Sequence, residues 1–225
     1  MGSLQIPRGR VDFERLDQVA EGIERSIYTS ADFPDLVFKL QKSLHVRQTS
    51  HVGLKRFLMN NWAGFQHYNV TLENQTYLNI CLTRQVDLDA LPFAHIYGYV
   101  SSQAGVLQMC EKITLDGDKM GPSLKAIGEQ GGFTPDDGTQ LNSFIAELVR
   151  LHVPLHDMTG NNIVKGLGND GQPRFVLIYG LGDVNVIQLR RYSAKAQRQY
   201  LVKACSRFDK NGLRFDPETF TFALL

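Results

Sequence analysis

The segment that decides the fold lies at residues 155–164 and reads Leu155-His156-Asp157-Met158-Thr159-Gly160-Asn161-Asn162-Ile163-Val164. It places Asp157 and Asn162 five positions apart, between a helix-like stretch and apolar residues typical of a strand. This is the spacing of a phosphoryl-transfer loop, in which the Asp accepts or orients the proton of the attacking hydroxyl and the Asn carbonyl helps to hold magnesium on the nucleotide phosphates. Because such a pair also arises by chance, its meaning depends on the rest of the chain.

The residues on either side of this loop predict a helix before it and strands after it. Apolar residues recur upstream at the spacing of an amphipathic helix, at Leu141, Phe144, Ile145, Leu148 and Val149. Asp136 or Asp137 can cap the start of this helix. Downstream, short strands are expected at 163–164 and 175–178 around a Gly/Asn/Asp turn, and a further helix at 193–207.

The first half of the chain predicts an antiparallel sheet with one helix. Short stretches rich in β-prone residues, separated by turn residues, are expected to form five strands, at 11–16, 26–29, 36–40, 93–100 and 105–111. A helix is expected at 72–82, where Leu78, Cys81 and Leu82 share one side. The stretch 43–69 has no clean period and is expected to be partly helical.

A turn-rich segment at 115–123 separates the two halves. The sequence therefore predicts an α+β chain of two lobes. The first lobe, at 11–114, is a five-stranded antiparallel sheet with one helix and forms the nucleotide side. Residues 115–123 form the hinge, and 124–225 form a reduced, mainly helical lobe that carries the catalytic loop.

Composition points to an ordinary soluble protein. Lys and Arg number 24 against 23 Asp and Glu, a formal charge of +1, so the overall balance does not favour a nucleic-acid partner. No apolar run approaches the roughly 18 residues needed to span a bilayer. The three cysteines, Cys81, Cys110 and Cys205, are far apart and odd in number, which argues against a disulfide framework. We expect a cytoplasmic protein.

Other residues follow the order that a phosphoryl-transfer site requires. Such a site needs a cation on the phosphates, an anchor for that cation and metal ligands. Lys39 ends a predicted strand and can point toward α- and β-phosphates, although a solvated strand-edge lysine is an equal alternative. Glu73, expected in the first turn of the following helix, can anchor Lys39, or can be a surface charge favoured by the helix dipole. Gly22 lies where a phosphate-covering turn would be, but no G-x-G-x-x-G motif is present.

Several short motifs together resemble a known family. They are Leu36-Val37-Phe38-Lys39-Leu40, the 115–123 segment, and Asn162 followed by Tyr179-Gly180-Leu181-Gly182-Asp183. In this order they resemble the small YrbL-type family, named for a member of the PhoP regulatory network. The resemblance covers nearly the whole chain from about Val11. It implies a compact, bilobal, protein-kinase-like fold of bacteria.

The resemblance also implies roles for individual residues. Lys39 would be the phosphate-contacting lysine and Glu73 its helix partner. Glu111 with its neighbours would form the hinge against the adenine. Asp157 would be the acid of the catalytic loop and Asn162 a metal ligand. The implied cofactors are ATP and Mg²⁺.

One position departs from the family pattern. Kinase-like members carry a metal-binding Asp just before a Gly-containing turn, where this chain has Tyr179. A phenol is neutral near pH 7 and offers one oxygen, so it is a poor magnesium ligand. Asp183 can replace the missing carboxylate, or Asn162, Asp157 and the nucleotide can hold magnesium alone. A third alternative is that no metal is bound productively.

Three functions remain open at this point. The first is a kinase-like phosphotransferase that moves the ATP γ-phosphate to an unidentified hydroxyl acceptor, with Asp157 orienting that hydroxyl. The second is a pseudokinase that binds a nucleotide or a regulatory partner. The third is an α+β binding domain in which Lys39 and Asp157 lie far apart. Because the chain after Asp183 is short for a peptide-docking lobe, a small-molecule acceptor, or none, is at least as plausible as a protein.

Overall fold

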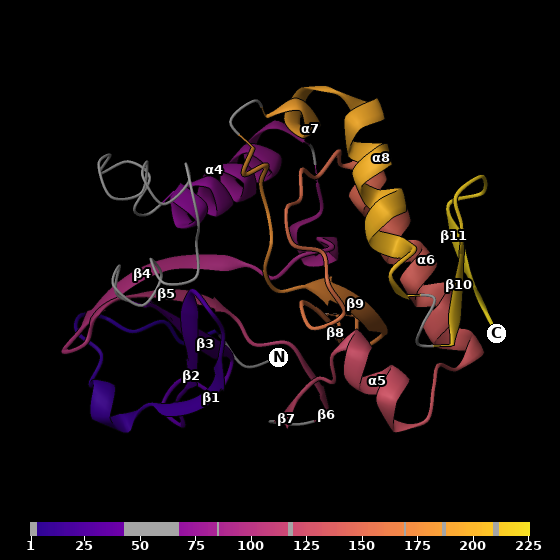
Figure 1. The fold of residues 1–225 in the computed structure, drawn as a ribbon. Helices are drawn as coiled ribbons and strands as arrows, with labels where there is room; N and C mark the ends of the chain where they lie inside the picture. Colours follow the sequence, from indigo (N-terminus) through magenta and orange to yellow (C-terminus); the bar gives the residue numbers. More distant parts are fainter. Residues whose placement is uncertain are drawn as a thin grey trace. The chain divides into compact units, whose positions relative to one another are not determined.

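The computed structural model describes residues 4–42, 68–84, 86–116, 119–168, 170–185, 188–208 and 212–225. The chain divides into two compact units (Figure 1). The first comprises residues 1–68 and 95–112, and the second comprises residues 69–94 and 113–225. None of the helices in the described part of the chain is long and apolar enough to cross a membrane.

The first unit is built on one antiparallel sheet. Its strands are β1 (Asp17–Glu21), β2 (Arg25–Thr29), β3 (Leu36–Gln41), β4 (Ile96–Ser102) and β5 (Gly105–Glu111). They lie in the order β1-β2-β3-β5-β4, and each neighbouring pair is antiparallel. The predicted five-stranded antiparallel sheet is therefore confirmed.

Strand β3 is buried on both faces, since its consecutive residues Leu36, Val37, Phe38 and Lys39 are all buried. Successive side chains of a strand point to opposite sides of the sheet, so these residues divide between the two faces. Leu36 and Phe38 are fully buried, and they pack into the unit's apolar core. The other members of this core are Val11, Val100, Leu107 and Met109. The opposite face of β3 carries Val37 and Lys39. Lys39 is thus held on a central strand, away from the apolar core.

The prediction of a strand at 11–16 is wrong. Val11 makes only an isolated bridge to Ser102, and the 3-10 turn η1 (Phe13–Arg15) follows it. The Asp12 carboxylate accepts a hydrogen bond from the Glu14 backbone N–H at 3.2 Å. Such local bonds from Asp favour a turn over an extended strand. The first strand begins only at Asp17.

The expected helix forms as α4 (Tyr68–Thr83), but it buries a different face. Leu78 and Leu82 are 52% and 81% exposed. The buried residues of α4 form a stripe of mixed polarity at Asn69, Leu72, Glu73, Thr76 and Ile80. The spacing of the apolar residues predicted that the face with Leu78 and Leu82 would be buried. That prediction is wrong because polar residues contribute to the face of α4 that is buried. Most of the stretch 43–69, expected to be partly helical, lies outside the described residues.

The second unit contains helices and two-stranded ribbons. The helices besides α4 are η2 (Leu88–Ala90), α5 (Leu124–Gln130), α6 (Pro135–Arg150), α7 (Leu189–Tyr192) and α8 (Ala194–Cys205). The ribbons pair β6 (Thr114–Asp116) with β7 (Lys119–Met120), β8 (Ile163–Leu167) with β9 (Pro173–Leu177), and β10 (Leu213–Asp216) with β11 (Thr221–Leu224). The segment 115–123 thus includes the β6–β7 ribbon.

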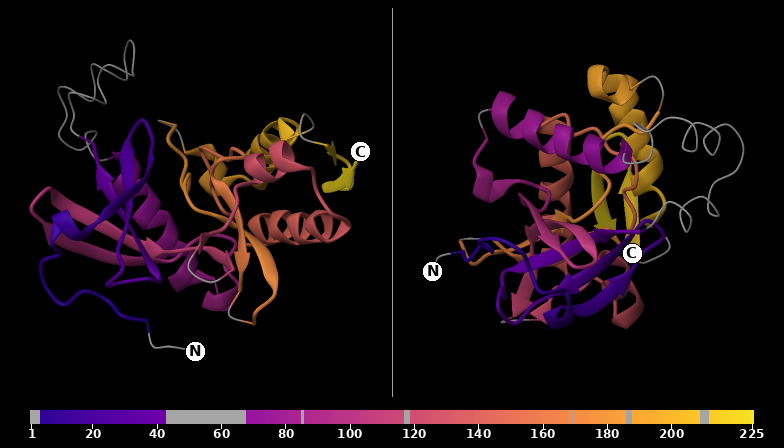
Figure 2. Two further views of the ribbon diagram at one scale, coloured as in Figure 1. Left: turned by 90° about the horizontal axis from the view of Figure 1, so that it is seen from below. Right: turned by 90° about the vertical axis from the view of Figure 1, so that its left-hand side faces the viewer.

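Helix α6 organises the core of this unit. Its apolar stripe, including Leu141, Ile145 and Leu148, is fully buried. Gln197 of α8 donates to the backbone oxygens of Leu148 and Val153, at 3.0 and 2.9 Å. The β10–β11 hairpin runs beside α6 (Figure 2), where the Asn142 amide and the Phe222 backbone exchange two hydrogen bonds. These contacts fix the helix that precedes the candidate loop.

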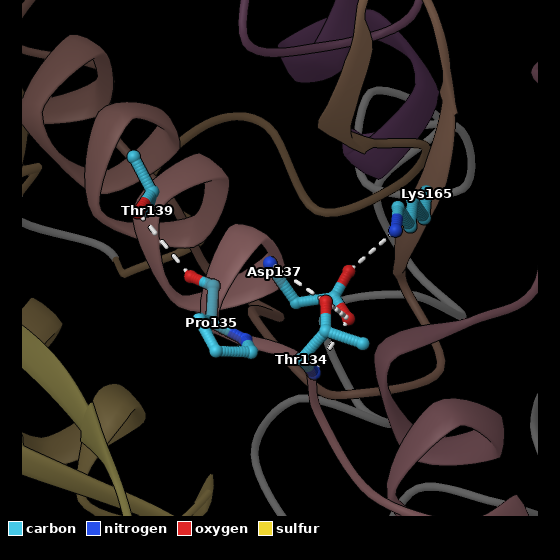
Figure 3. Close-up of polar contacts among 5 residues, drawn as sticks. All are labelled: Thr134, Pro135, Asp137, Thr139 and Lys165. Atoms are coloured by element: carbon cyan, nitrogen blue, oxygen red, sulfur yellow. Dashed lines mark hydrogen bonds and ion pairs between the residues drawn. The ribbon is translucent and has the colours of Figure 1, made fainter.

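An ion pair joins the start of α6 to β8 (Figure 3). Thr134 caps α6, and its hydroxyl accepts from the Asp137 backbone N–H. The Asp137 carboxylate accepts from the Thr134 backbone N–H at 2.9 Å and from Lys165 Nζ at 2.5 Å. Burial alone would raise the pKa of Asp137, but the hydrogen bonds from Lys165 and Thr134 outweigh burial and hold this pKa below its ordinary value.

We expect Lys165→Met to lower the free energy of unfolding by about 2–3 kcal/mol, because it leaves the buried Asp137 carboxylate without its cation. Urea unfolding at neutral pH measures the change. Lys125→Met is the matched control, since Lys125 makes an exposed ion pair with Glu129, and such pairs contribute about 1 kcal/mol or less. Equal effects of the two substitutions would contradict this account of the Asp137–Lys165 pair.

The same pair predicts a dependence of stability on acid. Because the folded-state pKa of Asp137 is lower than its ordinary value of 3.8, this carboxylate stabilises the fold above pH 3.8, and the stabilisation is lost as pH falls through the folded-state pKa. In Lys165→Met the pKa of Asp137 rises toward its ordinary value. The difference in the free energy of unfolding between wild type and Lys165→Met should therefore shrink as the pH falls below 3.8.

Candidate functional site

The structure brings the two residues of the D-x-x-x-x-N pair together. Asn162 Nδ2 donates to the backbone oxygen and to Oδ2 of Asp157, both at 2.9 Å. The amide nitrogen of Asn162 donates both bonds, so its amide Oδ1 is directed away from Asp157. Both side chains are partly exposed. The loop between α6 and β8 therefore presents a carboxylate and an amide oxygen in one place.

The segment that follows β9 lies directly against this loop. Leu155 and Leu181 form an isolated antiparallel bridge. The His156 backbone N–H donates to the Gly180 oxygen at 2.9 Å, and the Gly182 N–H donates to the Pro154 oxygen at 2.7 Å. Gly180 has φ +106°, and a Cβ there would lie 2.8 Å from the backbone oxygen of Asp157. Glycine is required at position 180 because the two backbones are in contact.

A second layer of residues holds the loop from behind. The Met158 backbone N–H donates to the Tyr200 hydroxyl at 3.0 Å. Arg190 donates to the backbone oxygen of Leu155, and its guanidinium lies 4.4 Å from the centre of the Tyr200 ring. Burial raises the pKa of Tyr200, so its hydroxyl stays neutral near pH 7. Arg190 and Tyr200 therefore fix the backbone on both sides of Asp157.

Asp183 is part of this second layer. It is 1% exposed. One carboxylate oxygen accepts from the backbone N–H and side-chain amide of Asn185, at 3.2 and 2.7 Å. The same oxygen lies 3.4 Å from the Arg190 guanidinium, and the other accepts from the Arg190 backbone N–H at 2.9 Å. Asp183 thus anchors Arg190, which in turn holds Leu155.

Lys39 and Glu73 are both buried, and they belong to different units. Lys39 lies on β3 and is 7% exposed, whereas Glu73 lies on α4 and is 2% exposed. Because α4 begins at Tyr68, Glu73 is in its second turn rather than its first. The favourable dipole of a helix N-terminus therefore does not account for this glutamate. The pairing of Lys39 with Glu73 stays a prediction.

The other two residues predicted to contact the nucleotide are Gly22, in the turn between β1 and β2, and Glu111, at the end of β5. Gly22 closes the β1–β2 hairpin, where its N–H donates to the Arg25 oxygen at 2.8 Å. Glu111 ends β5 and exchanges two hydrogen bonds with the His95 backbone, at 2.9 and 3.0 Å. The side chain of Glu111 thus braces the segment that enters β4. Contacts of either residue with a nucleotide stay predictions.

Comparison with known families decides which family this chain belongs to. The family model for the PhoP regulatory network protein YrbL matches residues 11–212. This chain belongs to the YrbL family. The resemblance inferred from the short motifs is thereby confirmed. No curated protein matches the chain.

Solved structures show what fold this YrbL family member has. The crystal structure of Rad53 1-466 in complex with AMP-PNP matches with a TM-score of 0.50 and 13% identity, covering 95% of this chain and 49% of that chain. A crystal structure of WbdD matches with a TM-score of 0.43 and 10% identity, covering 82% of this chain and 35% of that one. The chain thus spans less than half the length of either structure. The protein-kinase-like, bilobal fold predicted from the sequence is confirmed.

In this YrbL family member, the two positions outside the 157–162 loop that could supply a magnesium ligand do not present an available carboxylate. Mg²⁺ takes hard oxygen ligands, and in nucleotide sites one or two carboxylates hold it together with waters and substrate phosphates. Tyr179 lies where the family resemblance implies a metal-binding Asp, and its ring packs edge-on to His156 with centroids 5.5 Å apart. Asp183, one of the alternatives for replacing that carboxylate, binds Asn185 and Arg190 through hydrogen bonds. No group of three or more His, Cys, Asp or Glu in the described residues is placed to hold a metal.

Sequence reasoning missed the residues that support the loop. Arg190 and Tyr200 act through backbone atoms of distant residues, Leu155 and Met158. No motif or spacing marks such contacts, because they depend on how α7 and α8 pack in the folded chain. The same holds for Gln108, which lies opposite Lys39 on β5.

Proposed function

We propose that this YrbL family member is a nucleotide-binding pseudokinase, a kinase-like protein that binds ATP without a resident magnesium ion and acts through a regulatory partner. The observation that carries the proposal is the state of the two metal positions. Tyr179 stands where a carboxylate is expected, and Asp183 is 1% exposed and bound to Arg190 and Asn185. Magnesium would have to displace these internal donors to reach Asp183.

The sheet of the first unit supports the nucleotide-binding half of the proposal. Lys39 is held on a buried central strand, which limits its freedom and suits a fixed contact to phosphate oxygens. Glu111 is braced at the end of β5, where the adenine contact is expected. The similar Rad53 structure is a complex with AMP-PNP. When bound, magnesium in such folds neutralises phosphate charge, and here Lys39 supplies positive charge to the phosphates.

Thermal unfolding with ATP, with ADP and without nucleotide, all in the presence of a metal chelator, tests the proposal. We expect ATP and ADP to raise the midpoint, with a stabilisation of about 2.7 kcal/mol at a ligand concentration one hundred times Kd. Lys39→Met should remove most of this shift, whereas Lys125→Met on the exposed face of α5 should keep it. Absence of a shift with every nucleotide, in chelator and in added Mg²⁺ alike, would exclude nucleotide binding.

A second candidate function, phosphotransfer to a hydroxyl acceptor, is favoured by one observation. Asn162 holds the Asp157 carboxylate through Oδ2 at 2.9 Å, which leaves Oδ1 to accept the proton of a hydroxyl group. This is the arrangement that orients an acceptor. The acceptor class is unidentified, so the assay is release of ADP from ATP with Mg²⁺ added. Turnover that Asp157→Asn abolishes would establish phosphotransfer, whereas a pseudokinase releases no ADP above the spontaneous rate.

A further inference from the structure

The face of the first sheet that carries Lys39 also carries a buried arginine. In the register of the sheet, Ile27 on β2 pairs with Lys39 on β3, and Lys39 pairs with Gln108 on β5. Directly paired residues of neighbouring strands point to the same face. Arg25 lies two residues before Ile27, so it shares this face as well. Arg25, Lys39 and Gln108 are 5%, 7% and 3% exposed.

The guanidinium of Arg25 binds the residue that pairs with Lys39 across the sheet. Arg25 Nη1 donates to Gln108 Oε1 at 3.1 Å. Arg25 is on β2 and Gln108 is on β5, and β3 runs between these two strands. The Arg25 side chain must therefore cross β3 to reach Gln108, which is the direct cross-strand partner of Lys39. Two cationic side chains, Arg25 and Lys39, thus share one buried face with Gln108.

The third polar group on this face is also a donor. Because Gln108 Oε1 accepts from Arg25, the amide nitrogen Nε2 faces the other way. It is fully buried, and it has no hydrogen-bond partner among the described residues. Native proteins rarely leave such a buried donor unsatisfied. Guanidinium, ammonium and amide N–H groups all donate, so the complementary group is rich in anionic oxygens.

We propose that Arg25, Lys39 and Gln108 form a seat for the polyphosphate of the bound nucleotide, in which Arg25 is a second phosphate-contacting cation. This inference rests on the proposed nucleotide binding. The Arg25 guanidinium would then supply to the polyphosphate the positive charge that magnesium supplies in a metal-bound site. The anionic oxygens that accept from these donors could instead come from a carboxylate of this chain. Glu73 is the candidate for this alternative, because it is the predicted partner of Lys39.

The test is the affinity of the full chain for inorganic tripolyphosphate and for ATP, measured by titration calorimetry in chelator. Loss of a charge-assisted hydrogen bond weakens binding by about 10- to 100-fold, and we expect that loss for Arg25→Met with both ligands. Arg15→Met is the matched control, because Arg15 makes an exposed ion pair with Asp32 in the same unit, and its affinities should equal those of wild type. Equal affinity of Arg25→Met and wild type would overturn the seat.

The outcomes separate this inference from the proposed function. If wild type binds tripolyphosphate more tightly than Arg25→Met does, but does not bind ATP, the polyphosphate site is supported and the proposed nucleotide binding is wrong. If neither ligand binds, the seat is overturned. If Arg25→Met lowers the unfolding midpoint without ligand and leaves both affinities unchanged, the anionic oxygens belong to the chain's own carboxylate, which also overturns it.

A milder variant covers the case in which Arg25→Met does not fold. Arg25→Lys keeps the charge but loses the planar fork of donors that reaches Gln108. We expect this variant to fold and to bind tripolyphosphate about threefold or more weakly than wild type. Unchanged affinity in Arg25→Lys would count against a direct role of the guanidinium.

Discussion

Replacing Gly180 by alanine is expected to lower the free energy of unfolding by about 3 kcal/mol or more. Two effects add at this position. Gly180 has φ +106°, a conformation that L side chains rarely adopt, and the new Cβ would lie 2.8 Å from the backbone oxygen of Asp157. Backbone cannot move aside as a flexible side chain can. Urea unfolding measures the loss, and it should come with weaker binding of ATP because the loop around Asp157 must shift.

Gly132→Ala separates the two effects. Gly132 has φ +87°, but a Cβ there meets nothing within 4 Å. The control therefore carries the conformational cost, about 1 kcal/mol, without the contact. If both substitutions destabilise equally, the close approach of the 179–182 segment to the loop around Asp157 is not what requires glycine at position 180.

The second large effect is expected for Asp183→Asn, which keeps the shape of the side chain and removes its charge. The amide offers only one acceptor oxygen and turns an NH₂ group toward donors of Asn185 or Arg190. Removing one partner of a buried, charged hydrogen-bond network costs about 3–5 kcal/mol. The fall in the free energy of unfolding should appear without any nucleotide or metal. Arg190 would also lose its anchor, so the backbone at Leu155 should exchange its amide protons faster.

Asp216→Asn is the matched control for this change. Asp216 accepts from the Glu218 backbone N–H and the Thr219 hydroxyl, both at 2.8 Å, but it is exposed. Solvent can replace these bonds, so a much smaller loss is expected. A stable Asp183→Asn protein whose binding of ATP became insensitive to added Mg²⁺ would instead assign Asp183 to a metal site.

Sequence alone predicted the elements whose residues carry a local signal. β5 forms at the residues expected, 105–111, because its turn residues and β-prone run are contiguous. The helix before the Asp157 loop follows from the spacing of Leu141, Ile145 and Leu148. The approach of Asn162 to Asp157 follows from the five-residue spacing that a tight loop between a helix and a strand can close.

The rest depends on contacts between distant residues. The buried face of α4 includes Asn69 and Glu73, which a count of apolar residues assigns to solvent. Asp183 looked available for a metal because its partners, Asn185 and Arg190, carry no motif. Gln108 reads as an ordinary polar residue of a strand, and only the register of β3 with β5 places it opposite Lys39. These features arise from packing, which no local pattern encodes.

The affinity for ATP with added Mg²⁺ and with chelator tests the central claim most directly, since the claim is that this chain binds nucleotide without a metal site. Titration calorimetry should give wild-type affinities that agree within about threefold between the two conditions, or about 0.7 kcal/mol. Tyr179→Asp restores the carboxylate next to Gly180, and there Mg²⁺ should strengthen binding by about tenfold or more. A wild-type affinity that rises tenfold or more with Mg²⁺, and that Tyr179→Asp leaves unchanged, would contradict the claim.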